Sequence, residues 1–197
     1  MKILLTFFVL LFSSSVVAED ISDFEIEGMS IGDSALEFIS LEEIQKEIKR
    51  TKSHYEHLEN PYEFGEVYLK NKEFQTYDFM SFFVKTDNEK YKIYAIRGMI
   101  DYNDDIEGCI NKKNEISNFL SNIFKDAKKI EDNFNHSIDS SGNSKVYGIY
   151  FILKSGEEVS VDCIDFEETF RNKMNFSEGI TVGITTVEFD NWIRRKK

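Results

Sequence analysis

The sequence predicts an α+β fold, with a mainly antiparallel sheet of about five to seven strands and two or three helices packed on one face. Most apolar segments of strand length are separated by short turns, which is the spacing of antiparallel neighbours. One long segment has apolar residues at helical spacing, so a helix can cover a face of that sheet. The hydrophobic content of 41% is that of a folded domain.

The N-terminal half of the chain contains one predicted helix and four predicted strands. Ser40 and Glu43 form a capping box, which predicts a helix from Leu41 to about Lys52. Pro61 breaks this helical region. Alternating or aromatic-rich segments predict a short strand or an extended segment at 21–27 and strands at 62–70, 75–85 and 91–102.

The clearest predicted helix runs from Asp104 to about Ile130. Asp104 and Glu107 fit the N-cap and N3 positions. Lysines near residue 129 suit the negative end of the helix dipole. The face that we expect to be buried consists of Cys109, Ile116, Leu120, Ile123, Ala127 and Ile130.

The C-terminal part predicts a polar loop, a hairpin, a short helix and a last strand. The loop covers 137–144, and the hairpin strands 146–154 and 157–164 turn at Ser155 and Gly156. The short helix covers 166–173 and the last strand 180–189, after which Trp192 packs the end of the chain down.

Residues 1–18 have the three parts of a signal peptide. Lys2 gives a positive start, 3–12 is an unbroken apolar run, and Val16 and Ala18 occupy the positions that signal peptidase reads. The run is shorter than the roughly 20 residues of a membrane-spanning helix. We therefore expect cleavage after Ala18 and a single globular α+β domain over 19–197. We expect that domain in the periplasm or secreted, with no transmembrane segment.

The charge balance bears on the partner. The chain has 36 acidic and 24 basic residues, for a net charge of −12. Phosphate contacts need Lys and Arg, so this excess argues against nucleic acid. The partner that we expect is a protein, a peptide or a small molecule, with no cofactor.

The two cysteines, Cys109 and Cys163, predict a disulfide, because an exported chain folds in an oxidising compartment. The bridge would close a loop of about 55 residues and contribute roughly 4 kcal/mol. The alternative is a reactive thiol at Cys109, near the start of the long predicted helix.

Gly28 to Gly32 matches the G-x-S-x-G nucleophile elbow, with Ser30 as the serine. The nucleophile strand of an α/β-hydrolase is central, whereas here only about ten mature residues precede the motif. A tight turn in which Ser30 bonds to local backbone is the preferred interpretation, and an exported serine hydrolase is the alternative.

His54 and His57 form an H-x-x-H pattern that could offer two nitrogens to a metal. Zinc needs at least a third protein ligand, and His136 is the only other histidine. Two surface histidines near the C-terminus of a helix, where positive charge suits the helix dipole, are the preferred interpretation.

The acidic segment Asp101–Glu107 resembles the start of a calcium-binding EF-hand loop. Its sixth position is Ile106, where the loop needs glycine, and its twelfth is Lys112, where glutamate should chelate. Helix capping explains these acids better. Whether they, or the histidine pair, bind a metal stays open.

The mature start, D-F-E-I-E-G-M-S-I-G-D-S at 23–34, resembles the opening of small exported proteins of SAR11-type marine alphaproteobacteria. The likeness covers about 30 residues. It implies a bacterial periplasmic location and a structural turn at Ser30, and it implies no catalytic residue.

These observations favour a non-enzymatic exported domain that binds its partner through the sheet or the loops. The alternatives are a serine hydrolase that uses Ser30 and a thiol-redox protein that uses Cys109. The aromatic residues between 62 and 94 are expected mainly in the core, with an aromatic ligand groove as the alternative.

The export signal predicts that the mature N-terminus is Glu19, because Val16 and Ala18 fit the cleavage positions. N-terminal sequencing of the exported protein checks this, and a sequence that begins at Met1 would contradict it.

Overall fold

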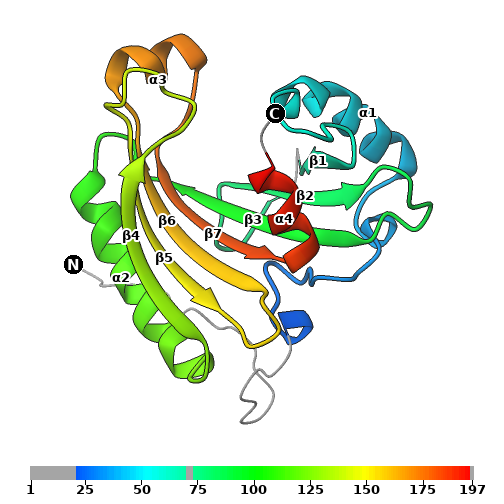
Figure 1. The fold of residues 1–197 in the computed structure, drawn as a ribbon, viewed down its shortest axis with the longest axis horizontal. Coiled ribbons are helices and arrows are strands. Elements are labelled where there is room, and N and C mark those ends of the chain that lie inside the picture. Colours follow the sequence, from blue (N-terminus) through cyan, green and yellow to red (C-terminus); the bar gives the residue numbers. More distant parts are fainter. Residues whose placement is uncertain (1–20, 70–72, 196–197) are drawn as a thin grey trace.

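The computed structural model describes residues 21–69 and 73–195, and its centre is one curved, fully antiparallel sheet (Figure 1). The strand order is β1-β2-β3-β7-β6-β5-β4. The strands are β1 (Phe64–Tyr68), β2 (Phe79–Lys85), β3 (Ile93–Asp101), β4 (Lys128–Asn135), β5 (Lys145–Ile152), β6 (Glu158–Asp165) and β7 (Gly179–Thr185). This sheet confirms the predicted fold class.

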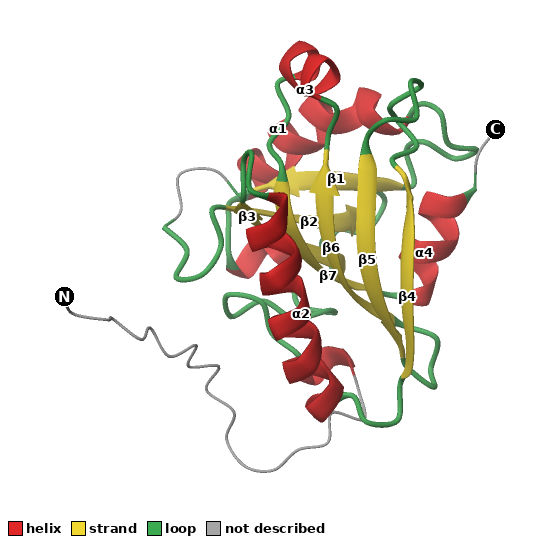
Figure 2. Cartoon of the chain, turned by 90° about the vertical axis from the view of Figure 1, so that its left-hand side faces the viewer, coloured by secondary structure: helices red, strands yellow, loops and turns green. Residues whose placement is uncertain are grey.

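Helices lie on both faces of the sheet. α1 (Leu41–Thr51) packs on β1, and α2 (Ile106–Ile123) runs across β5, β6 and β7 on the outer, convex face (Figure 2). α4 (Val187–Arg194) lies against β3 on the inner, concave face (Figure 1). α3 (Glu168–Met174) stands at the end of the sheet between β6 and β7.

The described residues also form three short 3₁₀ helices, at Ile21–Asp23, Ala35–Glu37 and Lys52–Tyr55. The first of these replaces the short strand or extended segment that we expected at 21–27. Only Ile26 of that segment forms a bridge, to Met29, because Glu27 and Gly28 both have positive φ and turn the chain back at once.

Each face of the sheet has its own hydrophobic core, because successive strand residues point to opposite sides. The larger core lies beneath α1 and α2 and includes Ile44, Phe82 and Leu120. The smaller core lies on the concave face and consists of Leu58, Phe64, Phe83, Ala95, Phe189 and Trp192. The second core fills only one end of the concave face, beneath α4.

The long predicted helix is shorter than expected at both ends. Its N-cap is Asp105, whose side chain accepts from the Gly108 backbone N–H at 2.9 Å, and not Asp104. Asp104 has φ 62° and pairs with Arg171 at 2.9 Å. The helix ends at Ile123, so the stretch that contains the lysines at 128 and 129 is the edge strand β4.

A disulfide joins α2 to the sheet. Cys109 and Cys163 are bonded, with their Cα atoms 6.0 Å apart. Both residues are buried in the convex-face core, one near the start of α2 and the other on β6. The bond therefore fixes the N-terminal end of α2 against the strand that it covers.

The described residues include no helix that is both long and apolar enough to cross a membrane. The predicted signal peptide, residues 1–18, lies outside the described residues.

The packing of α2 predicts a contrast between two neighbouring positions. Leu120→Ala should lower the free energy of unfolding by about 2–5 kcal/mol, because Leu120 is buried against the sheet. Asn118→Ala, on the exposed face of the same helix, should change it by less than about 0.5 kcal/mol. Urea titration of both variants measures this, and equal losses would contradict the orientation of α2.

Candidate functional site

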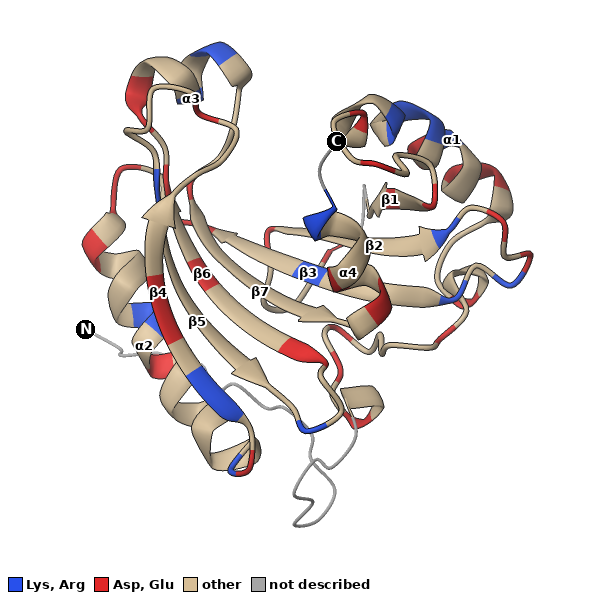
Figure 3. Cartoon of the chain, viewed as in Figure 1, with Lys and Arg blue, Asp and Glu red and all other residues tan. Residues whose placement is uncertain are grey.

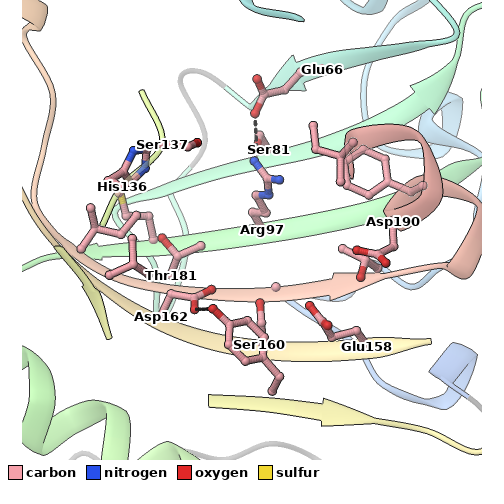
Figure 4. A pocket seen from close by; sticks show the side chains of 18 of the residues that line it. Glu66, Ser81, Arg97, His136, Ser137, Glu158, Ser160, Asp162, Thr181 and Asp190 are labelled. Atoms are coloured by element: carbon pink, nitrogen blue, oxygen red, sulfur yellow. Dashed lines mark hydrogen bonds between the residues drawn. The ribbon is translucent and has the colours of Figure 1, made fainter. Parts of the chain in front are cut away.

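The concave face of the sheet holds a cleft of about 440 Å³ (Figure 4). Side chains from all seven strands line it, and α4 closes one end. Its volume lies within the range of pockets that bind small molecules, about 300–1,000 Å³. Because lining residues alternate with core residues along β6 and β7, the sheet itself builds the floor of the cleft.

The strand register sets which side chains meet across the cleft. Arg97 on β3 pairs with Gly183 on β7, and Gly183 pairs with Ser160 on β6. A Cβ at Gly183 would come within 2.9 Å of the Ser160 hydroxyl. The glycine therefore leaves a hollow between the β3 wall and the β6 wall.

Arg97 dominates the β3 wall. Its guanidinium carbon lies 4.8 Å from the ring centre of Phe83 and 5.9 Å from that of Phe189, so both rings make cation–π contacts. Within the described chain, no hydrogen bond or ion pair to its side chain occurs. Figure 4 shows the side chain rising from β3 towards Ser81.

A buried carboxylate, Glu66, stands behind Arg97 on β1. It accepts hydrogen bonds from Tyr55 at 2.8 Å and from Ser81 at 3.0 Å, and His54 lies 3.9 Å away. Burial alone would raise the pKa of Glu66. The neighbouring His54, the charge of Arg97 and the two hydroxyl donors outweigh burial and lower that pKa. Glu66 is therefore ionised and offsets the charge of Arg97.

The opposite wall carries two further carboxylates, Glu158 and Asp162, on the same face of β6 (Figure 4). Asp162 accepts a hydrogen bond of 2.7 Å from the Tyr150 hydroxyl. The Tyr150 ring lies over Gly148, where a Cβ would come within 2.2 Å of the Tyr150 hydroxyl oxygen. This second glycine therefore allows Tyr150 to reach Asp162.

Glu158 is the least compensated acid of the cleft. Its side chain is 14% exposed, and its one ion-pair partner in the described residues is Arg194 of α4 at 3.5 Å. Burial raises the pKa of Glu158 to about 7; Arg194 lowers it, while Asp190 and Asp162 raise it. Burial also raises the pKa of Asp162.

Acids outnumber bases in the cleft. The described lining residues include four carboxylates, on Glu66, Glu158, Asp162 and Asp190, and two guanidinium groups, on Arg97 and Arg194. Figure 3 shows acidic segments on β6 and α4 and a basic segment on β3. Burial lowers the pKa of His136, which also lines the cleft, so this ring is neutral at pH 7.

The other end of the cleft is mainly apolar. The lining residues there are Phe79, Met99, Ile164, Val146 and Phe134, and Phe79 and Phe134 are nearly half exposed. The cleft is therefore amphipathic, with charged groups beside α4 and apolar groups at the end near α3. Part of the predicted aromatic cluster lies here, although most of its rings are buried in the two cores.

In the described structure, neither Ser30 nor the pair His54 and His57 forms part of a catalytic or metal-binding cluster. Ser30 is buried, its backbone N–H donates to Asp33 at 2.8 Å, and its hydroxyl donates to the Phe24 carbonyl at 3.4 Å. His54 and His57 are exposed on successive turns. In the part of the chain that the structure describes, no three His, Cys, Asp or Glu residues are arranged to hold a metal.

Sequence reasoning missed Arg97, Glu158 and Asp162 as site residues. The signal was present, because charged residues on strands predicted to be half-buried must face either solvent or a polar cleft. The sequence alone does not show that β3 and β6 lie two strands apart, and so it could not unite these residues.

The environment of Glu158 predicts a pH-dependent stability. The Glu158 carboxyl binds its proton more tightly in the folded protein, where its pKa is about 7, than in the unfolded chain, where its pKa has the ordinary value of 4.5. The free energy of unfolding therefore falls as the pH rises from about 4.5 to about 7. Glu158→Gln should therefore raise the melting temperature relative to the unmodified protein at about pH 8 and leave it nearly unchanged at about pH 5. Thermal unfolding at both pH values tests this.

Glu115→Gln is the matched control, because Glu115 is 71% exposed on α2. It should show no such difference between the two pH values. A Glu158 carboxyl that titrates near its ordinary value in NMR would contradict the prediction.

Comparison of the chain with known protein families, with curated proteins and with solved structures finds no match. The function is therefore inferred from the geometry and the charges of the cleft.

Proposed function

We propose that the protein is an exported, non-enzymatic binding protein whose small-molecule ligand lies in the cleft on the concave face of the sheet. One observation carries this proposal. A volume of about 440 Å³ is lined by charged, hydroxyl and apolar side chains from all seven strands, and glycine occupies its floor at Gly183. A concave, amphipathic pocket on a rigid scaffold is the usual form of a small-molecule site.

The arrangement of polar groups also favours binding. Glu66 and Asp162 are held by hydroxyl groups, which fixes their orientation before a ligand arrives. Groups that are already oriented lose little conformational entropy on binding. The excess of acids over bases disfavours nucleic acid as the occupant.

The two enzymatic alternatives have weaker support. A hydrolase would need the Ser30 hydroxyl to face a base, but this hydroxyl donates to the Phe24 carbonyl. Thiol–disulfide exchange would need an accessible sulfur, but Cys109 and Cys163 are bonded to each other and both are buried. Cys109 belongs to the convex-face core, and neither Ser30 nor Cys109 lines the cleft.

Export is part of the proposal. The signal-peptide pattern of residues 1–18 supports it, and so does the buried disulfide, which persists in oxidising compartments. A periplasmic location agrees with both observations.

Blocking the cleft tests the proposal. Thr181 lines the cleft on β7, so Thr181→Trp should fill it and abolish binding. The mature protein and this variant are each incubated with the small-molecule fraction of the native cell envelope. Native mass spectrometry should then detect an added mass on the unmodified protein and none on the variant.

Asn118→Trp adds the same side chain on the exposed face of α2 and should retain the added mass. The released compound should have the mass that it had in the extract, because no reaction occurs. An added mass that persists in Thr181→Trp, or a chemically altered compound, would contradict the proposal.

A further inference from the structure

The charged end of the cleft has an imbalance that a ligand could correct. Glu158 faces Asp190 and Arg194 from α4, Asp162 from its own strand, Tyr150 from β5 and, across the hollow, Arg97 from β3. Of these groups only Arg194 pairs with it, at 3.5 Å, and Arg194 is also bound to Asp190 at 2.6 Å. One guanidinium therefore serves two carboxylates.

An unpaired hydroxyl lies at the same place. Thr185 is the β7 partner of Glu158 in the sheet, and it lines the cleft. Its hydroxyl oxygen is buried and has no hydrogen-bond partner among the described residues. A buried polar atom without a partner is costly, and such atoms are rare in folded proteins. The corner formed by Glu158, Thr185 and Asp190 thus offers three acceptors and holds too few donors.

We propose that the ligand is an organic amine whose ammonium group binds in the corner formed by Glu158, Thr185 and Asp190. This proposal rests on the proposed function and names the chemical class of the ligand. An ammonium ion has three donors and no acceptor, so it matches the two carboxylates and the hydroxyl of the corner. Its organic part finds apolar side chains further along the cleft, including Met99 and Ile164.

The opposite choice, an organic anion at Arg97, is disfavoured by the charges. The carboxylate of Glu66 already offsets Arg97, and the rings of Phe83 and Phe189 pack beside its guanidinium. An anion would also meet the excess of acids in the cleft. A cation reduces that excess, so electrostatic complementarity favours the amine.

Three probes of equal length separate the classes: hexylamine, hexanoate and 1-hexanol. Each has six carbons in a linear chain, and the three differ in the charge and chemistry of the head group. Chemical-shift titration of the mature protein should give the highest affinity for hexylamine. Glu158→Gln should lower the affinity for hexylamine about tenfold or more, which is the factor expected when a hydrogen bond to a charged group is lost.

The binding should also depend on pH. An ammonium ion binds best to ionised Glu158, and hexylamine stays protonated throughout this range. Because Glu158 titrates near pH 7, the affinity should fall about tenfold from about pH 8 to about pH 6. In Glu158→Gln this dependence should disappear.

Controls exclude a general effect of charge or folding. Glu115→Gln removes the same charge from the exposed face of α2 and should leave the affinity for hexylamine unchanged. Asp190→Asn removes the second carboxylate of the corner and should also lower the affinity for hexylamine. Both variants and Glu158→Gln are first checked for a folded amide spectrum, so that Asp190→Asn serves as the test if Glu158→Gln does not fold.

The outcomes distinguish this proposal from the proposed function. If hexanoate or 1-hexanol binds more tightly than hexylamine, and Thr181→Trp abolishes that binding, the ligand is not an amine. The binding function then remains intact. Hexylamine binding that Glu158→Gln and Asp190→Asn do not change would also overturn the amine proposal. Failure of all three probes and of the envelope extract would remove the binding function itself.

Discussion

The pairing of β3 with β7 is the constraint on which the rest of the molecule depends. Strands β1 to β3 form one meander and β4 to β7 another, and this ladder of seven residue pairs joins the two into a single sheet. Its register sets Arg97 opposite Gly183 and so fixes the position of the hollow. A shift of one residue would turn Arg97 towards the convex core and Ile96 towards the cleft. The same pairing therefore specifies both the core and the site.

The cleft exists because the concave face lacks the layer that covers the convex face. On the convex side α1 and α2 complete the core, and the disulfide holds α2 in place. On the concave side α4 and its aromatic core cover only one end. Beyond them, glycine at 148 and 183 and hydroxyl side chains leave space that large apolar residues would have filled. Acids in that space are partly desolvated, which explains the raised pKa of Glu158.

The sequence predicted the antiparallel α+β class and most strands, because alternation and turn residues are local signals. It predicted α1 from the capping box that Ser40 and Glu43 form. It failed at β4, because Ala127 and Ile130 continue the helical spacing of α2 although Phe124 has left helical geometry. It failed at the site, because Arg97 and Glu158 are brought together by the β3–β7–β6 order, which no local pattern encodes.

The alternation of core and cleft residues along single strands has an evolutionary consequence. On β6, Val159, Val161 and Cys163 belong to the convex core, whereas Glu158, Ser160 and Asp162 face the cleft. Substitutions in the second set leave the packing of the first unchanged, so ligand preference can diverge between descendants of one ancestor while the scaffold persists. Gly183 is the exception, since any larger residue there occupies the hollow itself.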